Sequence, residues 1–221
     1  MREDLEQQEQ LAALKAFWAS NRKWITSVLI ILVLISVSTT GWKYYTESRQ
    51  LQASKLLSSM QEAVEEQKID DAILITNELS KNYSGYPQRG LAGLILSKAL
   101  VFDERKEEAE KQLRNLLNID SDISWVARVR LAGLLLDMNK PVEALSILPE
   151  KIPSIWIGIV SDRRGDVLMA LGKKVEARSA WVRALEVYGV DRAEGVARNM
   201  IKMKLATIDS LQVVDKKSGA K

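Results

Sequence analysis

One uncharged stretch, residues 25–41, limits what this chain can fold into more than any other feature. Its centre, residues 28–35, contains only Val, Leu and Ile. At about 1.5 Å rise per residue, a helix over the stretch spans roughly 26 Å, close to the ~30 Å of a bilayer core. Trp24 and Trp42 lie at its two ends, where aromatic side chains favour the membrane interface. The pattern predicts a transmembrane anchor over residues 24–45.

Two other interpretations of this stretch are a cleaved signal peptide and a buried core helix. The motif Ser36-Val37-Ser38 has the small-x-small form of a cleavage site. However, about two dozen residues precede the stretch, and it is longer than the apolar region of a usual signal. In a domain of this size, a helix that packs on the core usually keeps a polar face toward water, and residues 28–35 have none. We therefore expect a retained anchor.

The charges beside the span weakly favour an N-terminus in the cytoplasm. The cations before it are Arg2, Lys15, Arg22 and Lys23, and those that closely follow it are Lys43, Arg49 and Lys55. Because cytoplasmic flanks carry the excess of Lys and Arg, we expect residues 1–23 inside. The long C-terminal part then lies across the membrane, which in a bacterium is the periplasm.

Residues 1–23 carry Leu11, Leu14, Phe17 and Trp18 at helical spacing. This spacing favours an amphipathic helix that lies in the headgroup plane beside the span. A frayed cytosolic tail is the equal alternative.

Small and hydroxyl residues gather at the outer end of the span. Ser36 and Thr40 are four residues apart, so they share one helix face, as in small-xxx-small packing of membrane helices. These two residues are candidates for a contact with another membrane protein, although hydroxyl residues in such a span more often bond the carbonyls of their own helix.

From residue 46 onward the pattern is helical, with no alternating strand-like runs, and predicts an all-α domain. An acidic residue followed by alanine recurs at Ala72, Ala109, Ala144 and Ala177, at intervals of 37, 35 and 33 residues. These intervals bracket the tetratricopeptide (TPR) period of about 34 residues. We predict a TPR-like α-solenoid of about four helix-turn-helix repeats over residues 46–211.

Two further offsets from these alanines support the alignment. Twelve residues before them stand Met60, Ser97, Ala132 and Gly165, and four residues after them stand Thr76, Leu113, Leu148 and Trp181. Small side chains let the two helices of a repeat approach closely, and large ones fill the gap to the next repeat. In the fourth unit, Gly172 is placed to end a helix in the left-handed conformation.

A last helix is expected to cap the solenoid. Asp191 is its predicted N-cap, and its apolar residues are predicted to cover the end of the stack: Met200, Met203, Leu205, Ile208 and Leu211. Residues 212–221, which are polar from Asp215 onward, are predicted to form a disordered tail.

The chain has no Cys and no His. It therefore lacks the usual zinc and copper ligands, the usual general base near neutral pH and every Ser-His or Cys-His nucleophile. The adjacent pairs Glu65-Glu66 and Glu107-Glu108 point to different helix faces, so neither is an acid-base dyad. We expect no enzyme, no cofactor and no metal site.

Charge is unevenly distributed over the part that follows the span. Residues 47–122 contain 10 Lys and Arg against 14 Asp and Glu, whereas residues 123–221 contain 17 against 11. Ordinary solvated helix faces are the main interpretation, and an acidic partner or anionic lipid headgroups are the alternative. A nucleic-acid partner is not expected across a membrane. Helix phase places Arg128, Arg163 and Arg164 near the inner helices as candidate partner-binding residues.

The N-terminal region resembles a known family. The similar residues are the run 9–18 (EQLAALKAFW), Asn21-Arg22-Lys23-Trp24 and Gly41-Trp42-Lys43-Tyr44-Tyr45, followed by a TPR-like domain. In these features the chain resembles the YfgM-type ancillary subunits of the bacterial SecYEG translocon. The resemblance implies a single-pass inner-membrane protein whose periplasmic domain works with SecYEG and the chaperone PpiD. It also implies that the protein helps exported polypeptide segments reach periplasmic folding factors.

Two other function classes remain open from the sequence. One is a membrane-anchored TPR scaffold for envelope or cell-division assemblies. The other is a regulatory protein that acts through its cytoplasmic residues 1–23.

Overall fold

A computed structural model describes the backbone of residues 2–119, 122–188 and 192–218. Side chains are described for residues 7, 9–119, 122–188 and 195–210. Within these ranges the structure contains α-helices, one short 3₁₀ helix and no strand, which confirms the all-α prediction. The chain forms two compact units, Met1–Gln52 and Ala53–Lys221.

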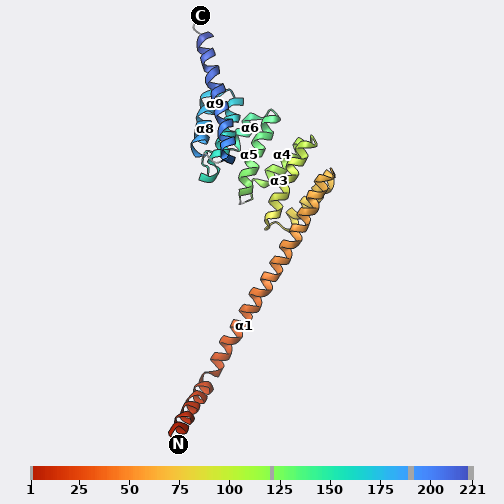
Figure 1. The fold of residues 1–221 in the computed structure, drawn as a ribbon. Coiled ribbons are helices and arrows are strands. Elements are labelled where there is room, and N and C mark those ends of the chain that lie inside the picture. The colour runs from red at the N-terminus through yellow and green to blue at the C-terminus, as the bar shows by residue number, and fades with distance from the viewer. Residues whose placement is uncertain (1, 120–121, 189–191, 219–221) are drawn as a thin grey trace. The chain divides into compact units, whose positions relative to one another are not determined.

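The first unit is a single stretch of helix α1, which runs from Arg2 to Glu65 (Figure 1). Its apolar side chains are exposed all round the helix, and Ile30, Val33 and Leu34 each expose 60% of their surface. Among the described residues this is the one helix long and apolar enough to cross a membrane. Water would make such exposure costly, whereas a lipid environment matches it. The exposed apolar helix agrees with the predicted anchor.

Hydroxyl side chains beside and within the span bond the helix backbone. Thr26 Oγ1 donates to the carbonyl of Arg22 at 2.7 Å, and Thr39 Oγ1 donates to the carbonyl of Ser36 at 3.0 Å. A hydroxyl bonded in this way carries no unsatisfied donor into the membrane. This is the behaviour that the sequence offered as the alternative to helix docking.

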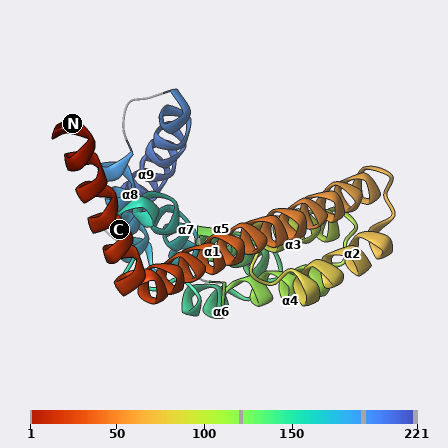
Figure 2. The same ribbon diagram turned by 90° about the horizontal axis from the view of Figure 1, so that it is seen from below.

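The second unit is a stack of helix pairs. Its helices after α1 are α2 (Ile69–Asn82), α3 (Pro87–Phe102), α4 (Lys106–Leu116), α5 (Asp122–Asp137), α6 (Pro141–Ser146), η1 (Ser154–Trp156), α7 (Ile157–Ala170), α8 (Lys174–Val187) and α9 (Arg192–Ser218). Each α-helix from α2 to α8 packs against the next α-helix, as α3 with α4 and α8 with α9 show in both views (Figures 1 and 2). In addition, α3 contacts α5 and α5 contacts α7. These first helices of successive units form one layer, as a TPR-like solenoid requires.

The predicted repeat positions are the core of this stack. The four repeat alanines, Ala72, Ala109, Ala144 and Ala177, are completely buried. The positions twelve before and four after each alanine are all buried as well: Met60, Ser97, Ala132, Gly165, Thr76, Leu113, Leu148 and Trp181. Gly165 shows why a small residue stands at such a crossing, because an added Cβ would overlap the indole of Trp181. The repeat alignment is therefore correct residue by residue.

A left-handed residue stands five positions before each repeat alanine. Gln67, Glu104, Asn139 and Gly172 have φ angles of 59°, 58°, 58° and 75°. At Glu104 the paired bonds of a Schellman turn form, from Arg105 N to Leu100 O at 2.9 Å and from Glu104 N to Val101 O at 3.2 Å. Equivalent bonds form at the other three turns. Sequence reasoning identified only Gly172, because glycine is the usual residue at this position of a helix end and the other three turns do not contain one.

Helix α6 is shorter than its counterparts in the other units, with six residues against 14 in α2 and α8. It ends before Pro149, which cannot donate to a helical hydrogen bond. Two arginines bond the carbonyls that the lost turns leave free. Arg128 of α5 donates to Ile147 O at 3.3 Å, and Arg164 of α7 donates to Leu148 O at 2.7 Å.

Helix α9 caps the fourth unit, with a buried face that coincides only in part with the one predicted. Ile201 and Ile208 are buried against Leu168 and Trp181, whereas Met200 and Met203 are exposed by 51% and 63%. The prediction for the two methionines is therefore wrong, whereas Ile208 is buried and Leu205 packs against the same cluster, as predicted. The predicted N-cap, Asp191, and the side chain of Leu211 lie outside the described residues.

An ion cluster fixes the phase of α9. Lys204 Nζ lies 2.7 Å from Asp162 Oδ1 and 2.6 Å from Asp166 Oδ1, both on α7. Burial raises the pKa of Asp162 above its usual value, against the opposing hydrogen bond from Lys204. The ammonium can reach both carboxylates only when Ile201 and Ile208 face the stack, because these residues lie on the same side of the helix.

Helix α9 also extends further than the sequence indicated. Its backbone is helical to Ser218, so the helix continues past residue 211, where the sequence predicted a tail. No Gly or Pro occurs between Gly195 and Gly219, so nothing in the sequence ends the helix earlier. Residues 219–221 lie outside the described residues.

Candidate binding groove

A groove of about 500 Å³ is lined mainly by α3, α5 and α7, the inner layer of the stack. Its floor is apolar or weakly polar, with the buried residues Ser97 and Leu134. Its rim carries Lys98 and Phe102 of α3 and Arg130 of α5. Concave pockets of roughly 300–1,000 Å³ with an apolar floor and a few polar groups are the usual form of binding sites.

Phe102 is the most exposed aromatic side chain of the rim. It exposes 77% of its surface at the C-terminal end of α3. Lys98 Nζ lies 5.6 Å from the centroid of its ring, within the range of a cation-π contact. Because it stands beside the groove, this ring is placed to contact a segment that enters it.

Arg130 and Arg163 come from neighbouring units and reach the same groove. Arg130 Nη1 donates to Leu94 O of α3 at 3.0 Å, which holds its side chain across the two helices. Arg163 of α7 lies over Gly133 of α5, where an added Cβ would stand 3.3 Å from the guanidinium carbon. The missing side chain at Gly133 therefore makes the room that Arg163 occupies.

Arg163 is only weakly paired. Its Nη1 lies 3.5 Å from Asp166 Oδ2, while Lys204 approaches the other oxygen of the same carboxylate much more closely. Within the described ranges, the buried Nε of Arg163 has no hydrogen-bond partner. With Lys98 and Arg130 it gives the groove three cations against one carboxylate, Asp137.

The structure separates the three arginines that the sequence placed together. Arg163 lines the groove, whereas Arg128 and Arg164 bond the carbonyls after α6, and Arg128 also lies 5.6 Å from the ring centroid of Trp125. Arg128 and Arg164 thus have a structural role here, and their part in partner binding stays a prediction.

Sequence reasoning missed Lys98, Phe102 and Arg130, although one signal was available for Arg130. Arg130 and Arg163 each stand fourteen residues before the repeat alanine of their unit, Ala144 and Ala177. Equivalent repeat positions face the same surface of a solenoid. No comparable signal marks Phe102, because its exposure depends on where α3 ends.

Ser36 and Thr40, the other predicted partner-binding residues, lie in the first unit. Both are exposed on α1, four residues apart and so on one face of the helix. Their predicted contact with another membrane protein stays a prediction.

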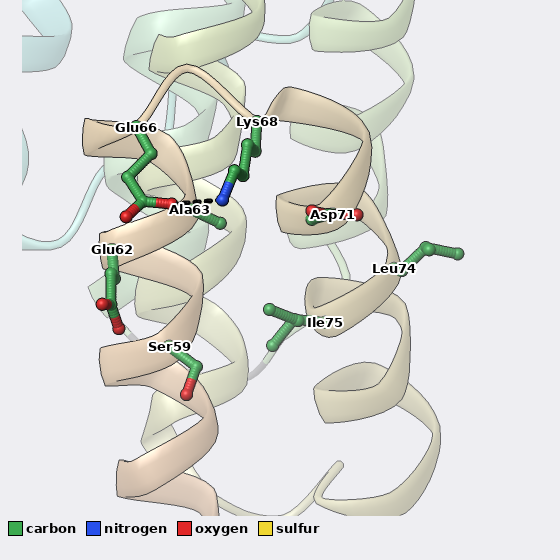
Figure 3. Close-up of a pocket in the computed structure, with 8 residues that line it drawn as sticks. All are labelled: Ser59, Glu62, Ala63, Glu66, Lys68, Asp71, Leu74 and Ile75. Carbon is green, nitrogen blue, oxygen red and sulfur yellow. Dashed lines mark ion pairs between the residues drawn. The ribbon is translucent and has the colours of Figure 1, made fainter.

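A second hollow of about 350 Å³ lies between the end of α1 and α2, and it is acidic (Figure 3). Ser59 of α1 and Ile75 of α2 point into the space between the helices, and Lys68 of the turn reaches toward Glu66. Lys68 Nζ lies 2.6 Å from Glu66 Oε2, and this hydrogen bond and charge raise the pKa of Lys68. In the parts of the chain that the structure describes, no group of carboxylates has the arrangement to hold a metal ion.

The chain is similar in sequence to known proteins. Residues 15–211, which contain the apolar span and the groove, match the tetratricopeptide repeat-like domain family. A protein of Escherichia coli named ancillary SecYEG translocon subunit is 31% identical over 180 residues, which cover 78% of this chain and 84% of the relative.

The chain belongs to the family of ancillary SecYEG translocon subunits. A member from Neisseria gonorrhoeae with the same name is 29% identical over 209 residues, which cover 92% of this chain and 98% of the relative. Another from Aggregatibacter actinomycetemcomitans is 26% identical over 192 residues, 84% of this chain. These ancillary subunits are named as parts of an assembly, and none of the three names describes an enzyme.

Proposed function

We propose that this chain is a non-catalytic ancillary subunit of the SecYEG translocon in the bacterial inner membrane. The observation that supports this most is the similarity to ancillary subunits over 92% of the chain, which exceeds the length of the repeat domain alone. An exposed apolar helix joined to a solenoid suits this role, because it supplies a membrane anchor and a binding surface without catalytic chemistry.

In this proposal the N-terminus lies in the cytoplasm and residues 46–211 form a periplasmic domain. The excess of cations before the span supports this orientation. The span, residues 24–45, contacts translocon subunits through the face of Ser36 and Thr40. The repeat domain binds segments of exported polypeptides and a PpiD-like periplasmic chaperone, and so connects export with folding.

Orientation can be tested with single cysteines, because the chain has none of its own. Gln10→Cys lies before the span and Ser84→Cys lies on an exposed turn of the repeat domain. In intact bacteria, a membrane-impermeant maleimide should label only Ser84→Cys. After the cells are opened it should label both variants. Labelling of Gln10→Cys alone in intact cells would refute the orientation.

The partners can be tested by photo-crosslinking in living cells. A photoreactive amino acid at Thr40 should capture translocon subunits, and one at Phe102 should capture exported polypeptides or the chaperone. Val142 on α6 is the matched control, because it is 71% exposed and lies outside the groove. Absence of every translocon subunit at Thr40, with cell-division or cell-wall proteins in their place, would support the scaffold function instead.

A further inference from the structure

We propose that the groove of α3, α5 and α7 selects extended polypeptide segments in which a carboxylate lies next to a bulky apolar side chain. This inference rests on the proposed function, in which the repeat domain receives polypeptide. It adds the chemical class of segment that the groove accepts.

The size of the groove indicates an extended segment. Its volume of about 500 Å³ suits one or two side chains. A helix with its side chains is about 10–12 Å wide and presents a whole face, which calls for a longer groove. In an extended segment successive side chains point in opposite directions, so one can enter the groove while its neighbour meets the rim.

Phe102 and the groove floor provide the apolar part of the site. The ring stands 77% exposed beside the buried Leu134. An incoming apolar side chain that covers this ring removes from water an area that the folded chain leaves exposed. Aromatic residues in such positions often carry much of the binding energy of an interface.

Arg130, Arg163 and Lys98 provide the charged part. Three cations around one carboxylate leave the groove positive, which complements an acidic segment and disfavours a basic one. The Nη1 of Arg163 has only a 3.5 Å contact with Asp166 Oδ2, and the side chain is 35% exposed, so its terminal nitrogens can bond an incoming carboxylate. Its planar fork also suits two parallel hydrogen bonds to one carboxylate.

The test uses the full chain in detergent and fluorescent peptides with blocked ends. The central triplets are Asp-Phe-Asp, Asn-Phe-Asn, Lys-Phe-Lys and Asp-Ala-Asp in a Gly-Ser background, and binding is measured by fluorescence anisotropy. We expect the Asp-Phe-Asp peptide to bind best and the Lys-Phe-Lys peptide worst. At roughly 1 M salt, where charges act over only ~3 Å, the preference for the acidic peptide should shrink.

Variants of the groove identify the residues responsible. Arg163→Gln and Arg130→Gln should each weaken binding of the Asp-Phe-Asp peptide by about tenfold, because a hydrogen bond to a charged group is lost. Phe102→Ala should weaken Asp-Phe-Asp and Asn-Phe-Asn alike, by roughly tenfold. The matched controls are Arg183→Gln on α8 and Leu74→Ala on α2, both exposed outside the groove, and both should bind like the parent. Unchanged circular dichroism confirms that each variant is folded.

Two outcomes overturn the inference. One is equal affinity for the acidic and basic peptides, and the other is full affinity in the folded Arg163→Gln and Arg130→Gln variants. Co-purification of SecYEG with the same preparations is measured in parallel. If SecYEG co-purifies while the peptides show no preference, the groove inference fails and the translocon function stands. If SecYEG is absent, the proposed function fails independently of the peptide result.

Discussion

The left-handed residues at the four turns lead to a prediction in which glycine stabilises the chain. Glu104 has a φ of 58°, a left-handed conformation that glycine adopts more easily than a residue with a side chain. For a residue with a Cβ, the left-handed conformation costs about 1–2 kcal/mol, while glycine adds back roughly 0.5–1 kcal/mol of unfolded-state entropy. We therefore expect Glu104→Gly to raise the free energy of unfolding by about 0.5–1 kcal/mol.

The four turns form a graded series with different expected signs. Gln67→Gly should behave like Glu104→Gly, because Gln67 has the same backbone conformation. Asn139→Gly should change stability little, since asparagine tolerates this conformation better than other residues. Gly172→Ala should cost about 1 kcal/mol through the backbone alone, because no atom lies within 4 Å of the added Cβ.

The assay is urea unfolding of the full chain in detergent, monitored by circular dichroism. The free energy of unfolding in water is obtained by linear extrapolation. Lys111→Gly is the matched control, because Lys111 is an exposed residue in the middle of α4. That change should cost about 1 kcal/mol, the usual penalty of glycine in a helix. A loss of stability in Glu104→Gly comparable to that of the control would refute the reasoning.

Three further changes test the packing of the stack in the same assay. Gly165→Ala should cost roughly 2–3 kcal/mol because its Cβ would overlap Trp181, whereas Gly195→Ala, with open space around it, should gain a few tenths to about 1 kcal/mol. Equal effects of the two would contradict the packing. Ile201→Ala should cost about 2–4 kcal/mol, since this side chain of α9 is fully buried against the stack. A loss below about 1 kcal/mol would show that Ile201 does not face the stack. Glu110→Gln should cost about 1 kcal/mol at pH 7. Measured as a function of pH, this cost should fade as the pH drops through the lowered pKa of Glu110, and a constant cost would refute the assignment.

The sign of the Glu110 effect follows from its neighbours. Burial alone would raise the pKa of this carboxylate, but hydrogen bonds from Lys140 at 2.9 Å and Arg114 at 2.7 Å lower it below its usual value. A carboxylate whose pKa is lower in the folded state adds stability above its unfolded pKa, about 4.3, and loses it as the pH falls through the folded pKa. Glutamine cannot make this contribution at any pH.

The sequence was sufficient to predict the stack because the repeat determines the packing. An alanine recurring at about the TPR period located the crossings, and residues as different as Met60 and Gly165 were correctly assigned to one buried position. The span was equally clear, since an uncharged stretch of this length has few alternatives. The sequence was therefore sufficient where a repeated spacing or an uncharged run allows only one arrangement.

Prediction failed where the outcome depends on contacts distant in the sequence. Helix α9 has two apolar stripes, one through Ile201 and one through Met200, and either could have faced the stack. The ion cluster of Lys204 with α7 decides between them, and its partners are 38 and 42 residues away. The groove was missed for a similar reason, because Arg130 and Phe102 come to line the same groove only after α3 and α5 have packed.

The short α6 has a consequence for cooperativity. In a linear array, stability is approximately the sum of the repeats and their nearest-neighbour interfaces, so a reduced unit weakens the coupling along the array. The buried residues of the repeat domain fall into two clusters that meet within α7, with Val167 in one and Leu168 in the other. Helix α7 therefore couples the unfolding of the two clusters, because it contributes residues to both. A segment bound at Arg163 of α7 would stabilise the helix that both clusters share.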